Sequence, residues 1–409
     1  MTGRRTRVIP ILPVAQNGAK AGGTLEFRAQ LPLSLYVHIP WCVQKCPYCD
    51  FNSHQMRDSL PEAEYLAALI ADLESALPLV WGRRIGSIFF GGGTPSLLSG
   101  EGLDMLLTAI RTRLPLLPDA EITLEANPGT VEAGKFAAFR SAGVNRLSLG
   151  IQSFNPAHLQ ALGRIHNGDE ARRAIEIAAR HFDNFNLDLM YGLPGQTIDQ
   201  ALADVETALA FAPTHLSCYH LTIEPNTAFA SAPPVLPEPD RCADMQEAIE
   251  ARVADAGFTH YETSAFARPE RQCRHNFNYW TFGDYLGIGA GAHGKLTLHD
   301  GKRWEVRRQM RWKQPKQYLA KVADGQALQD EFSVPTGDLA FEFMMNALRL
   351  NQGFDVSLFE ARTAQPLIAV EAILRLAEDE GLIVREPGRI APTKRGQRFL
   401  NRLLEMFLE

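Results

Sequence analysis

Three cysteines stand within eight consecutive positions of this sequence, as Cys42, Cys46 and Cys49 in the spacing C-x3-C-x2-C. A cubane cluster of four irons accepts four ligands, so three thiolates leave one iron open to an exchangeable ligand. The alternatives are a zinc site completed by His38 or His54, and buried thiols without a metal. Zinc sites typically space their ligands as two pairs, which this loop does not do. The spacing therefore favours an iron–sulfur cluster with one open iron.

The cysteines follow the first of six short apolar segments that are expected to be strands: 35–39, 85–90, 122–125, 146–150, 186–190 and 216–221. Segments with helical periodicity lie between and after them, at 61–77, 101–114, 131–142, 169–181, 198–211 and 240–256. Alternating strands and helices predict right-handed βα units around a parallel sheet. We therefore expect an α/β fold, an incomplete (β/α)6 barrel over residues 31–260, with the cysteine loop at the C-terminal mouth.

The rest of the 409-residue chain predicts further regions. Residues 1–30 are expected to be a disordered extension, and residues 261–330 a connecting region. From residue 331 to 409, helices near 339–350, 356–362 and 367–380, a hairpin at 382–391 and a final helix at 394–408 suggest a winged-helix-like α+β domain.

Composition excludes several classes of protein. With 45% hydrophobic and 22% charged residues, the chain is neither disordered nor a coiled coil, and a formal net charge of −6 provides no overall field for nucleic acid. No run of eighteen or so apolar residues offers a membrane-spanning helix. Pro10 and Pro13 interrupt the apolar stretch that follows Arg4, Arg5 and Arg7, which argues against a secretory signal. Six cysteines are too few for a disulfide scaffold, so we expect a cytoplasmic protein.

The segment YVHIPWCVQKCPYC at residues 36–49 resembles the radical S-adenosylmethionine (SAM) superfamily, and within it the coproporphyrinogen dehydrogenase and HemW branch. The resemblance implies a [4Fe-4S] cluster held by the three cysteines, whose unique iron is chelated by the amine and carboxylate of SAM. Reduction would split a carbon–sulfur bond of SAM and yield a 5′-deoxyadenosyl radical.

Polar groups at the ends of later strands suit the same ligand. Glycines at 91–93 let backbone groups approach a ligand closely, where they could donate to a carboxylate or accept from an amine. Acidic groups suit ribose hydroxyls and an ammonium, and a guanidinium suits a carboxylate. The resemblance implies these SAM-binding residues: Tyr36, Tyr48, Gly92, Gly93, Thr94, Glu125, Gln152, Arg164, Asp188 and His220.

Two features separate the branches. Coproporphyrinogen dehydrogenase has a fourth cysteine where this chain has Phe51, and the segment HNFNYW at 275–280 is similar to the H-N-x-x-Y-W element of HemW proteins. The resemblance therefore implies a heme chaperone, with oxygen-independent coproporphyrinogen III dehydrogenase as the alternative. His275 offers an axial ligand for heme iron, and Tyr279 and Trp280 offer flat faces to the porphyrin. A histidine beside aromatic residues is also often simply packed and hydrogen-bonded, and Cys273 is a second conceivable iron ligand.

A heme chaperone needs an acceptor protein, and a reducible cluster needs an electron donor such as a reductase or flavodoxin. Residues 295–316 carry eight Lys or Arg against two acidic residues; a solvated basic face is expected there, while heme propionates, anionic lipid at a membrane surface and single-stranded RNA are the ligands it could hold. An iron–sulfur or zinc protein that binds RNA is thus a third hypothesis.

The GIGAGA segment at 287–292 is expected to be a tight loop closing the site. Residues 331–409 have nine basic and twelve acidic side chains, which argues against DNA binding.

Overall fold

The computed structural model describes residues 25–57, 59–130 and 133–408. Its centre is one sheet of twelve strands, and the middle of that sheet is a run of parallel strands in sequence order. These are β1 (Leu33–Ile39), β4 (Ile85–Gly92), β5 (Leu116–Ala126), β6 (Arg146–Gln152), β7 (Phe185–Tyr191) and β8 (His215–His220). All six expected strands are present, and the incomplete barrel fold is confirmed.

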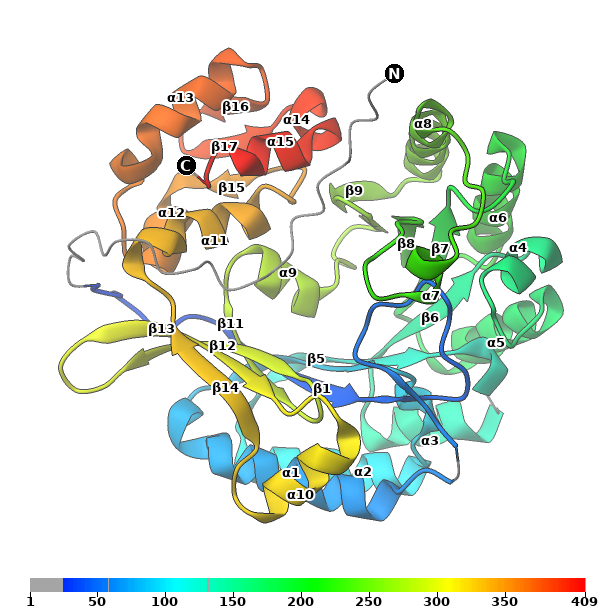
Figure 1. The fold of residues 1–409 in the computed structure, drawn as a ribbon, viewed down its shortest axis with the longest axis horizontal. Coiled ribbons are helices and arrows are strands. Elements are labelled where there is room, and N and C mark those ends of the chain that lie inside the picture. Colours follow the sequence, from blue (N-terminus) through cyan, green and yellow to red (C-terminus); the bar gives the residue numbers. More distant parts are fainter. Residues whose placement is uncertain (1–24, 58, 131–132, 409) are drawn as a thin grey trace.

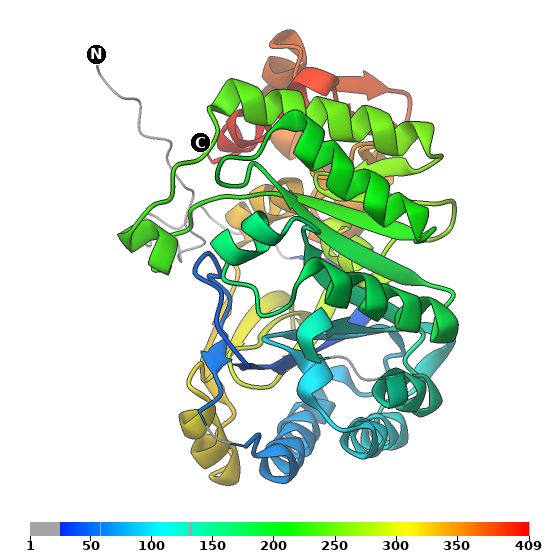
Figure 2. The same cartoon turned by 90° about the vertical axis from the view of Figure 1, so that its right-hand side faces the viewer.

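Helices cover the outer side of this curved sheet (Figures 1 and 2). They are α1 (Glu62–Val80), α2 (Gly100–Arg113), α3 (Ala133–Ala142), α5 (Gly168–His181), α6 (Ile198–Ala210) and α8 (Pro239–Asp255). Helix α5 illustrates the local cause: Asn167 and Glu170 form a reciprocal capping box at its start, and Ala171, Ile175 and Ala178 form the buried stripe. The expected helix start at 131–132 lies outside the described residues.

Short elements occupy the loops at the mouth of the barrel. They are β2 (Trp41–Cys42), β3 (His54–Gln55), η1 (Pro95–Leu97), η2 (Pro128–Thr130), α4 (Pro156–Ala161) and α7 (Ala228–Ser231). Strands β2 and β3 pair with each other and close the cysteine loop at its base.

Residues 259–333 extend the central sheet at both edges. At one edge β10 (Ala265–Ala267) pairs with β8 and with β9 (Thr259–Glu262). At the other, β11 (Asp284–Ile288) runs parallel to β1 and is followed by antiparallel β12 (His293–His299), β13 (Trp304–Arg311) and β14 (Leu328–Ser333). Helix α9 (Arg274–Trp280) links the two edges and packs on β4, and α10 (Pro315–Ala323) packs on α1. The region expected to connect two domains therefore shares the sheet of the barrel.

The basic stretch at 295–316 is only partly a solvated face: its exposed basic residues are Lys302, Arg303, Lys313 and Lys316. Lys295 and Arg311 are at most 2% exposed and pair with Asp284 at 2.9 Å and Asp72 at 3.2 Å. Arg308 pairs with Glu342 at 2.7 Å. The expectation was wrong for these three residues, because their acidic partners are distant in sequence and become neighbours only when the sheet and helices pack.

The C-terminal unit follows with its own core. Its elements are η3 (Thr336–Asp338), α11 (Leu339–Ala347), β15 (Phe354–Asp355), α12 (Val356–Thr363), η4 (Leu367–Val370), α13 (Glu371–Asp379), β16 (Ile383–Glu386), β17 (Arg389–Pro392), α14 (Lys394–Arg398) and α15 (Leu400–Glu405). The three strands form a small sheet in the order β15-β17-β16. The final segment is two short helices, because the backbone at Phe399 leaves the helical region.

Residues 25–30 differ from the expected disordered extension. Leu25, Phe27 and Leu31 are at most 7% exposed and belong to the C-terminal core, and the Phe27 ring meets the Trp304 ring edge-on at 5.5 Å. Apolar side chains with a surface to pack on remain ordered, which the local sequence does not reveal. Residues 1–24 lie outside the described residues. Among the described residues, no helix has the length and hydrophobicity to span a membrane.

Candidate functional site

The three cysteines lie together at the mouth of the barrel. Cys42 ends β2, and Cys46 and Cys49 lie in the loop that returns to β3. A tight turn brings the last two together, because the Cys49 N–H donates to the Cys46 carbonyl at 3.2 Å. All three side chains are free thiols and half-buried. Ser53 adds a hydroxyl 3.6 Å from Cys49 Sγ.

The electrostatics of these thiols suits a cationic group between them. Burial raises the pKa of Cys42, and negative charge on Cys49 and Cys46 raises it further. Burial also raises the pKa of Cys49, with Cys46 adding to the effect. No three His, Cys, Asp or Glu side chains among the described residues surround a point where a single ion would sit. An iron–sulfur cluster is larger than one ion, carries the iron that thiolates bind and spaces its ligands accordingly, so this donor set fits it.

The glycine run after β4 packs tightly against the first strand. A Cβ on Gly92, whose φ is +113°, would lie 2.5 Å from His38 Cε1, and one on Gly93 would lie 2.5 Å from the Trp41 carbonyl oxygen. The backbone N–H groups are already engaged: Gly92 donates to Glu125 Oε2 at 3.2 Å, Gly93 to the Ile39 oxygen and Thr94 to the Trp41 oxygen, both at 2.7 Å. This segment is therefore suited to accept from an amine and not, as the sequence also allowed, to donate to a carboxylate.

Two carboxyl groups face the barrel interior near these glycines. Burial, with the charge of Asp188 second, raises the pKa of Glu125 to about 8. Burial also raises the pKa of Asp188, which accepts hydrogen bonds from Asn186 at 2.8 Å and Ser148 at 3.1 Å. Arg146, at 2% exposure, lies near enough to lower the pKa of both. A pKa of about 8 leaves Glu125 largely protonated at neutral pH, and a cationic ligand would favour its ionised form.

Arg164 connects the expected nucleoside side of the site to the cysteine loop. Its guanidinium donates to the Gly150 carbonyl at 2.7 Å and to Cys46 Sγ at 3.5 Å. Tyr48 lies beside the same groups, and as a hydrogen-bond partner it raises the pKa of Arg164. Gln152 is the last residue of β6, and its left-handed φ of +67° ends the extended strand at the barrel mouth. Arg164 and Tyr48 thus lie beside Cys46, and their expected contacts with SAM stay a prediction.

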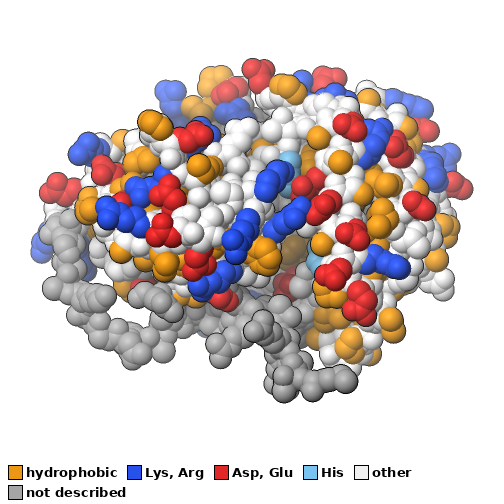
Figure 3. Space-filling model, turned by 90° about the horizontal axis from the view of Figure 1, so that it is seen from above, with side chains coloured by type: hydrophobic (Ala, Val, Ile, Leu, Met, Phe, Trp, Pro, Cys, Tyr) orange, Lys and Arg blue, Asp and Glu red, His pale blue; other side chains and the backbone are white. Residues whose placement is uncertain are grey.

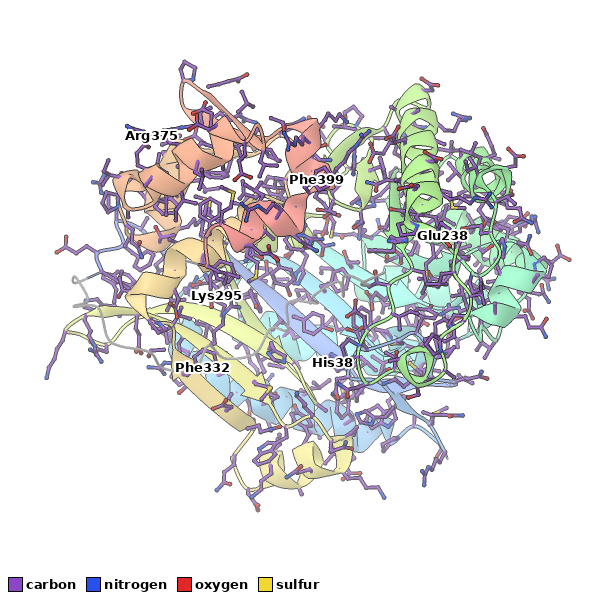
Figure 4. All side chains as sticks on the ribbon, turned by 45° about the horizontal axis from the view of Figure 1, so that its top comes forward. His38, Glu238, Lys295, Phe332, Arg375 and Phe399 are labelled. Atoms are coloured by element: carbon purple, nitrogen blue, oxygen red, sulfur yellow. The ribbon has the colours of Figure 1, made fainter. Side chains whose placement is uncertain are left out.

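His38 is a site residue that the sequence indicated only as a possible zinc ligand. It lies on β1 (Figure 4), and its Nε2 donates to the Asn52 carbonyl at 2.9 Å. Its Nδ1 must then accept, and it accepts from the Tyr36 hydroxyl at 3.0 Å. Burial lowers the pKa of His38 to about 4, so the imidazole is neutral. His38 thus links Tyr36 to the cysteine loop. Its imidazole among the apolar residues of the expected strand was the sequence feature that could have identified it as a site residue.

His220 and His275 each pack against aromatic rings of the barrel strands. His220 ends β8 as an exposed residue, stacked on Tyr191 with ring centroids 5.3 Å apart. His275 is fully buried on α9; its Nδ1 lies 3.0 Å from Ser87 Oγ and its Nε2 2.8 Å from the Tyr279 hydroxyl. Burial lowers the pKa of His275 to about 3. In this conformation neither ring nitrogen of His275 is free to bind iron.

Cys273 and the two aromatic residues of the H-N-x-x-Y-W element differ in exposure. Cys273 is 1% exposed and its Sγ donates to Glu121 at 3.6 Å, while burial raises the pKa of Cys273 to about 12. Tyr279 and Trp280 are half-buried, and the Arg349 guanidinium lies 4.4 Å above the Trp280 ring. Tyr279 and Trp280 therefore keep part of their surface exposed, with Arg349 over one face of the Trp280 ring, while the histidine and cysteine are enclosed.

Comparisons with known proteins agree with this geometry. A family model described as the radical SAM superfamily matches residues 36–208, and one described as the HemN C-terminal domain matches residues 334–399. The chain is 48% identical to the heme chaperone HemW of Escherichia coli (strain K12), over 92% of this chain and 98% of that protein. It is 36% identical to the heme chaperone HemW of Mycobacterium tuberculosis (strain H37Rv), over 90% of this chain and 92% of that protein.

Among solved structures, coproporphyrinogen III oxidase (HemN) from Escherichia coli, described as a radical SAM enzyme, is similar with a TM-score of 0.79. The identity is 26%, and the match covers 92% of this chain and 90% of that chain. The fold is thus shared with coproporphyrinogen III oxidase, so the architecture does not separate the two branches.

Proposed function

The chain belongs to the heme chaperone HemW family within the radical SAM superfamily, and from this we propose that it binds heme and transfers it to an acceptor protein. The observation that carries the proposal is the extent of similarity, 48% identity over 92% of the chain, to proteins named for that activity. Phe51, in place of a fourth cysteine, supports the same choice over coproporphyrinogen dehydrogenase activity.

The proposed cofactors are a [4Fe-4S] cluster and SAM, with the cluster and SAM controlling heme transfer. When bound and reduced, this pair supplies a 5′-deoxyadenosyl radical. In the proposal Cys42, Cys46 and Cys49 hold three irons, and the carbonyls of the glycine segment accept from the SAM amine. Glu125 and Asp188 provide the negative charge that a sulfonium and ribose hydroxyls prefer.

The proposed partners follow from these cofactors. We place the protein in the cytoplasm, with a flavodoxin or a reductase as its electron donor. Any contact with a membrane is peripheral, at the membrane surface. The side chains of Phe51 and Val43 are 64% and 38% exposed on the cysteine loop, which gives a donor apolar surface close to the cluster.

The proposed heme ligand is His275, with Tyr279 and Trp280 against the porphyrin. Ligation requires His275 to exchange a hydrogen bond to Ser87 or Tyr279 for the iron, so α9 must shift when heme binds. A ligand that must first break a protein hydrogen bond is labile, which suits a chaperone that both loads and releases heme.

Heme titration of the purified protein, followed by the Soret band, tests this function. We expect a saturable shift in the wild type and its loss in His275→Ala. The control is Ser87→Ala, which frees Nδ1 and keeps the imidazole, so heme should bind it at least as tightly. The absence of a shift in the wild type would refute heme binding. A shift in His275→Ala identical to that of the wild type would refute His275 as the ligand and leave the function intact.

A further inference from the structure

The glycine-rich segment at 287–292 forms the turn from β11 to β12, a feature that the proposed cofactors do not explain. Gly289 and Gly291 have φ of +102° and +81°, which glycine adopts without strain. The turn is closed by the Ala292 N–H, which donates to the Gly289 oxygen at 3.0 Å. A nucleotide-binding fingerprint would lead into a helix, whereas this segment joins two strands of the sheet edge.

Helix α1 fixes the turn from behind. The Tyr65 hydroxyl accepts from the Ala290 N–H at 2.9 Å and donates to the His38 oxygen at 2.7 Å. Asp72 accepts from the Gly289 N–H at 3.0 Å and from the Arg311 guanidinium at 3.2 Å. Since Tyr65 and Asp72 are at most 1% exposed, the turn is a rigid support.

Asn52, three residues after Cys49, attaches the cysteine loop to this support. Its Nδ2 donates to the Ala290 oxygen and to the Lys313 oxygen, each at 2.9 Å. Its Oδ1 lies 3.3 Å from His54 Nε2, and its backbone oxygen accepts from His38. Both amide hydrogens and both oxygens of Asn52 are thus engaged, by groups from three separate parts of the fold.

Gly291 is shaped to admit this side chain. A Cβ at residue 291 would lie 2.1 Å from Asn52 Nδ2, closer than non-bonded atoms approach, so a larger residue would displace the amide. On its other side the cysteine loop is held by Gln44, which donates to the Gly163 oxygen at 3.3 Å, and by the Pro47 oxygen, which accepts from the Phe229 N–H at 3.0 Å. The loop is therefore held from both sides, and Asn52 is its tie to β11–β13.

We propose that Asn52 and the turn at 289–292 form a latch that sets the position of the three-cysteine loop relative to the barrel mouth. Asn52 is then a positioning residue, which acts on the cofactors only through the loop. The latch exists before any cofactor binds, because each of its contacts is between groups of the chain. The proposal rests on the cluster site of the proposed function.

Hydrogen exchange of the metal-free protein tests the latch without cofactors. Asn52→Asp keeps the shape of the side chain and an acceptor for His54, but it turns carboxylate oxygens toward two carbonyl oxygens. With two hydrogen bonds lost, we expect amides of residues 44–51 to exchange about tenfold faster or more, and amides of β4–β8 to exchange at the wild-type rate. After reconstitution, the reduced cluster of this variant should respond more weakly to SAM in its electron paramagnetic resonance spectrum.

Gln44→Glu is the matched control, because it makes the same amide-to-acid change on the other side of the loop at a longer, exposed hydrogen bond. We expect a smaller effect there. Gly291→Ala should reproduce the fast exchange with Asn52 intact, and combining it with Asn52→Asp should add little. Wild-type exchange rates at 44–51 in Asn52→Asp would overturn the latch, as would acceleration throughout the barrel, which marks an ordinary structural residue. Wild-type protein that takes up no iron and sulfide would instead refute the proposed cluster.

Discussion

At the scale of single residues, the barrel mouth is unusual in burying two acidic side chains close together. Glu125 and Asp188 both face the interior, and burial raises the pKa of each. A protein that needs only stability would replace such groups with apolar ones. Two buried acidic groups at this position suit a cationic ligand, whose charge would favour their ionised forms.

Glu125→Gln should therefore stabilise the metal-free protein at alkaline pH. The pKa of Glu125 is about 8 in the folded chain and near 4.5 in the unfolded chain, so the wild type loses stability as the pH rises from 4.5 to 8. Glutamine removes this loss. We expect the variant to gain on the order of 1–3 kcal/mol at pH 8.5 and much less at pH 5, since one unit of pKa corresponds to about 1.4 kcal/mol. Denaturant unfolding at the two pH values measures this, and an equal difference at both would contradict it.

At the scale of elements, the strands after the barrel are held by buried ion pairs. Lys295 (Figure 4) lies 2.9 Å from Asp284, and Arg83 lies 2.9 Å from the same carboxyl group. Burial alone would raise the pKa of Asp284, but Lys295 and Arg83 outweigh it and the pKa is lowered. One carboxylate thus joins β11, β12 and the loop between α1 and β4.

Lys295→Met should destabilise this edge strongly. Removing one partner leaves a buried charge incompletely compensated, which typically costs about 3–5 kcal/mol. The decrease should appear as a lower urea midpoint, and Lys302→Met, at an exposed position of the β12–β13 hairpin, is the matched control. Equal midpoints for the two variants would show that the ion pair contributes no more than a surface lysine.

At the scale of the whole molecule, the C-terminal unit is attached both by apolar packing and by ion pairs, of which Arg308–Glu342 is about one-fifth exposed. Arg398 and Lys394 also reach Glu247 and Glu250 on α8. Apart from Glu250 these side chains are more than half exposed, and such pairs contribute about 0–1 kcal/mol. Figure 3 shows acidic and basic side chains interspersed on this face. Apolar residues of the segment 25–31, by contrast, are buried in the C-terminal core.

Phe27→Ala should consequently loosen the C-terminal unit. Burial of the ring against Trp304 predicts a loss of about 2–4 kcal/mol, close to the usual range for a core phenylalanine. We expect the exchange of amides in α11 and β17 to accelerate while β4–β7 stay protected. Substitution of the exposed Phe399 by alanine is the control, and a uniform change over both units would contradict the assignment of Phe27 to this core.

The sequence by itself determined the six βα units, the winged-helix-like end and the family. Strand and helix periodicity depends on neighbouring residues, and Cys42, Cys46 and Cys49 lie close because they share one loop. Phe51 likewise distinguished the two branches from its position in the chain alone. Each of these inferences uses residues within a few positions of one another.

Tertiary structure alone decided which distant groups meet. Strands β9–β14 joined the barrel sheet, Lys295 and Arg311 found buried acidic partners, and His275 became enclosed between Ser87 and Tyr279. Asn52 met the turn at 289–292 across more than two hundred residues of chain. No local pattern encodes such contacts, because hydrogen bonds and ion pairs between remote segments form only once the packing of apolar faces has set their distance.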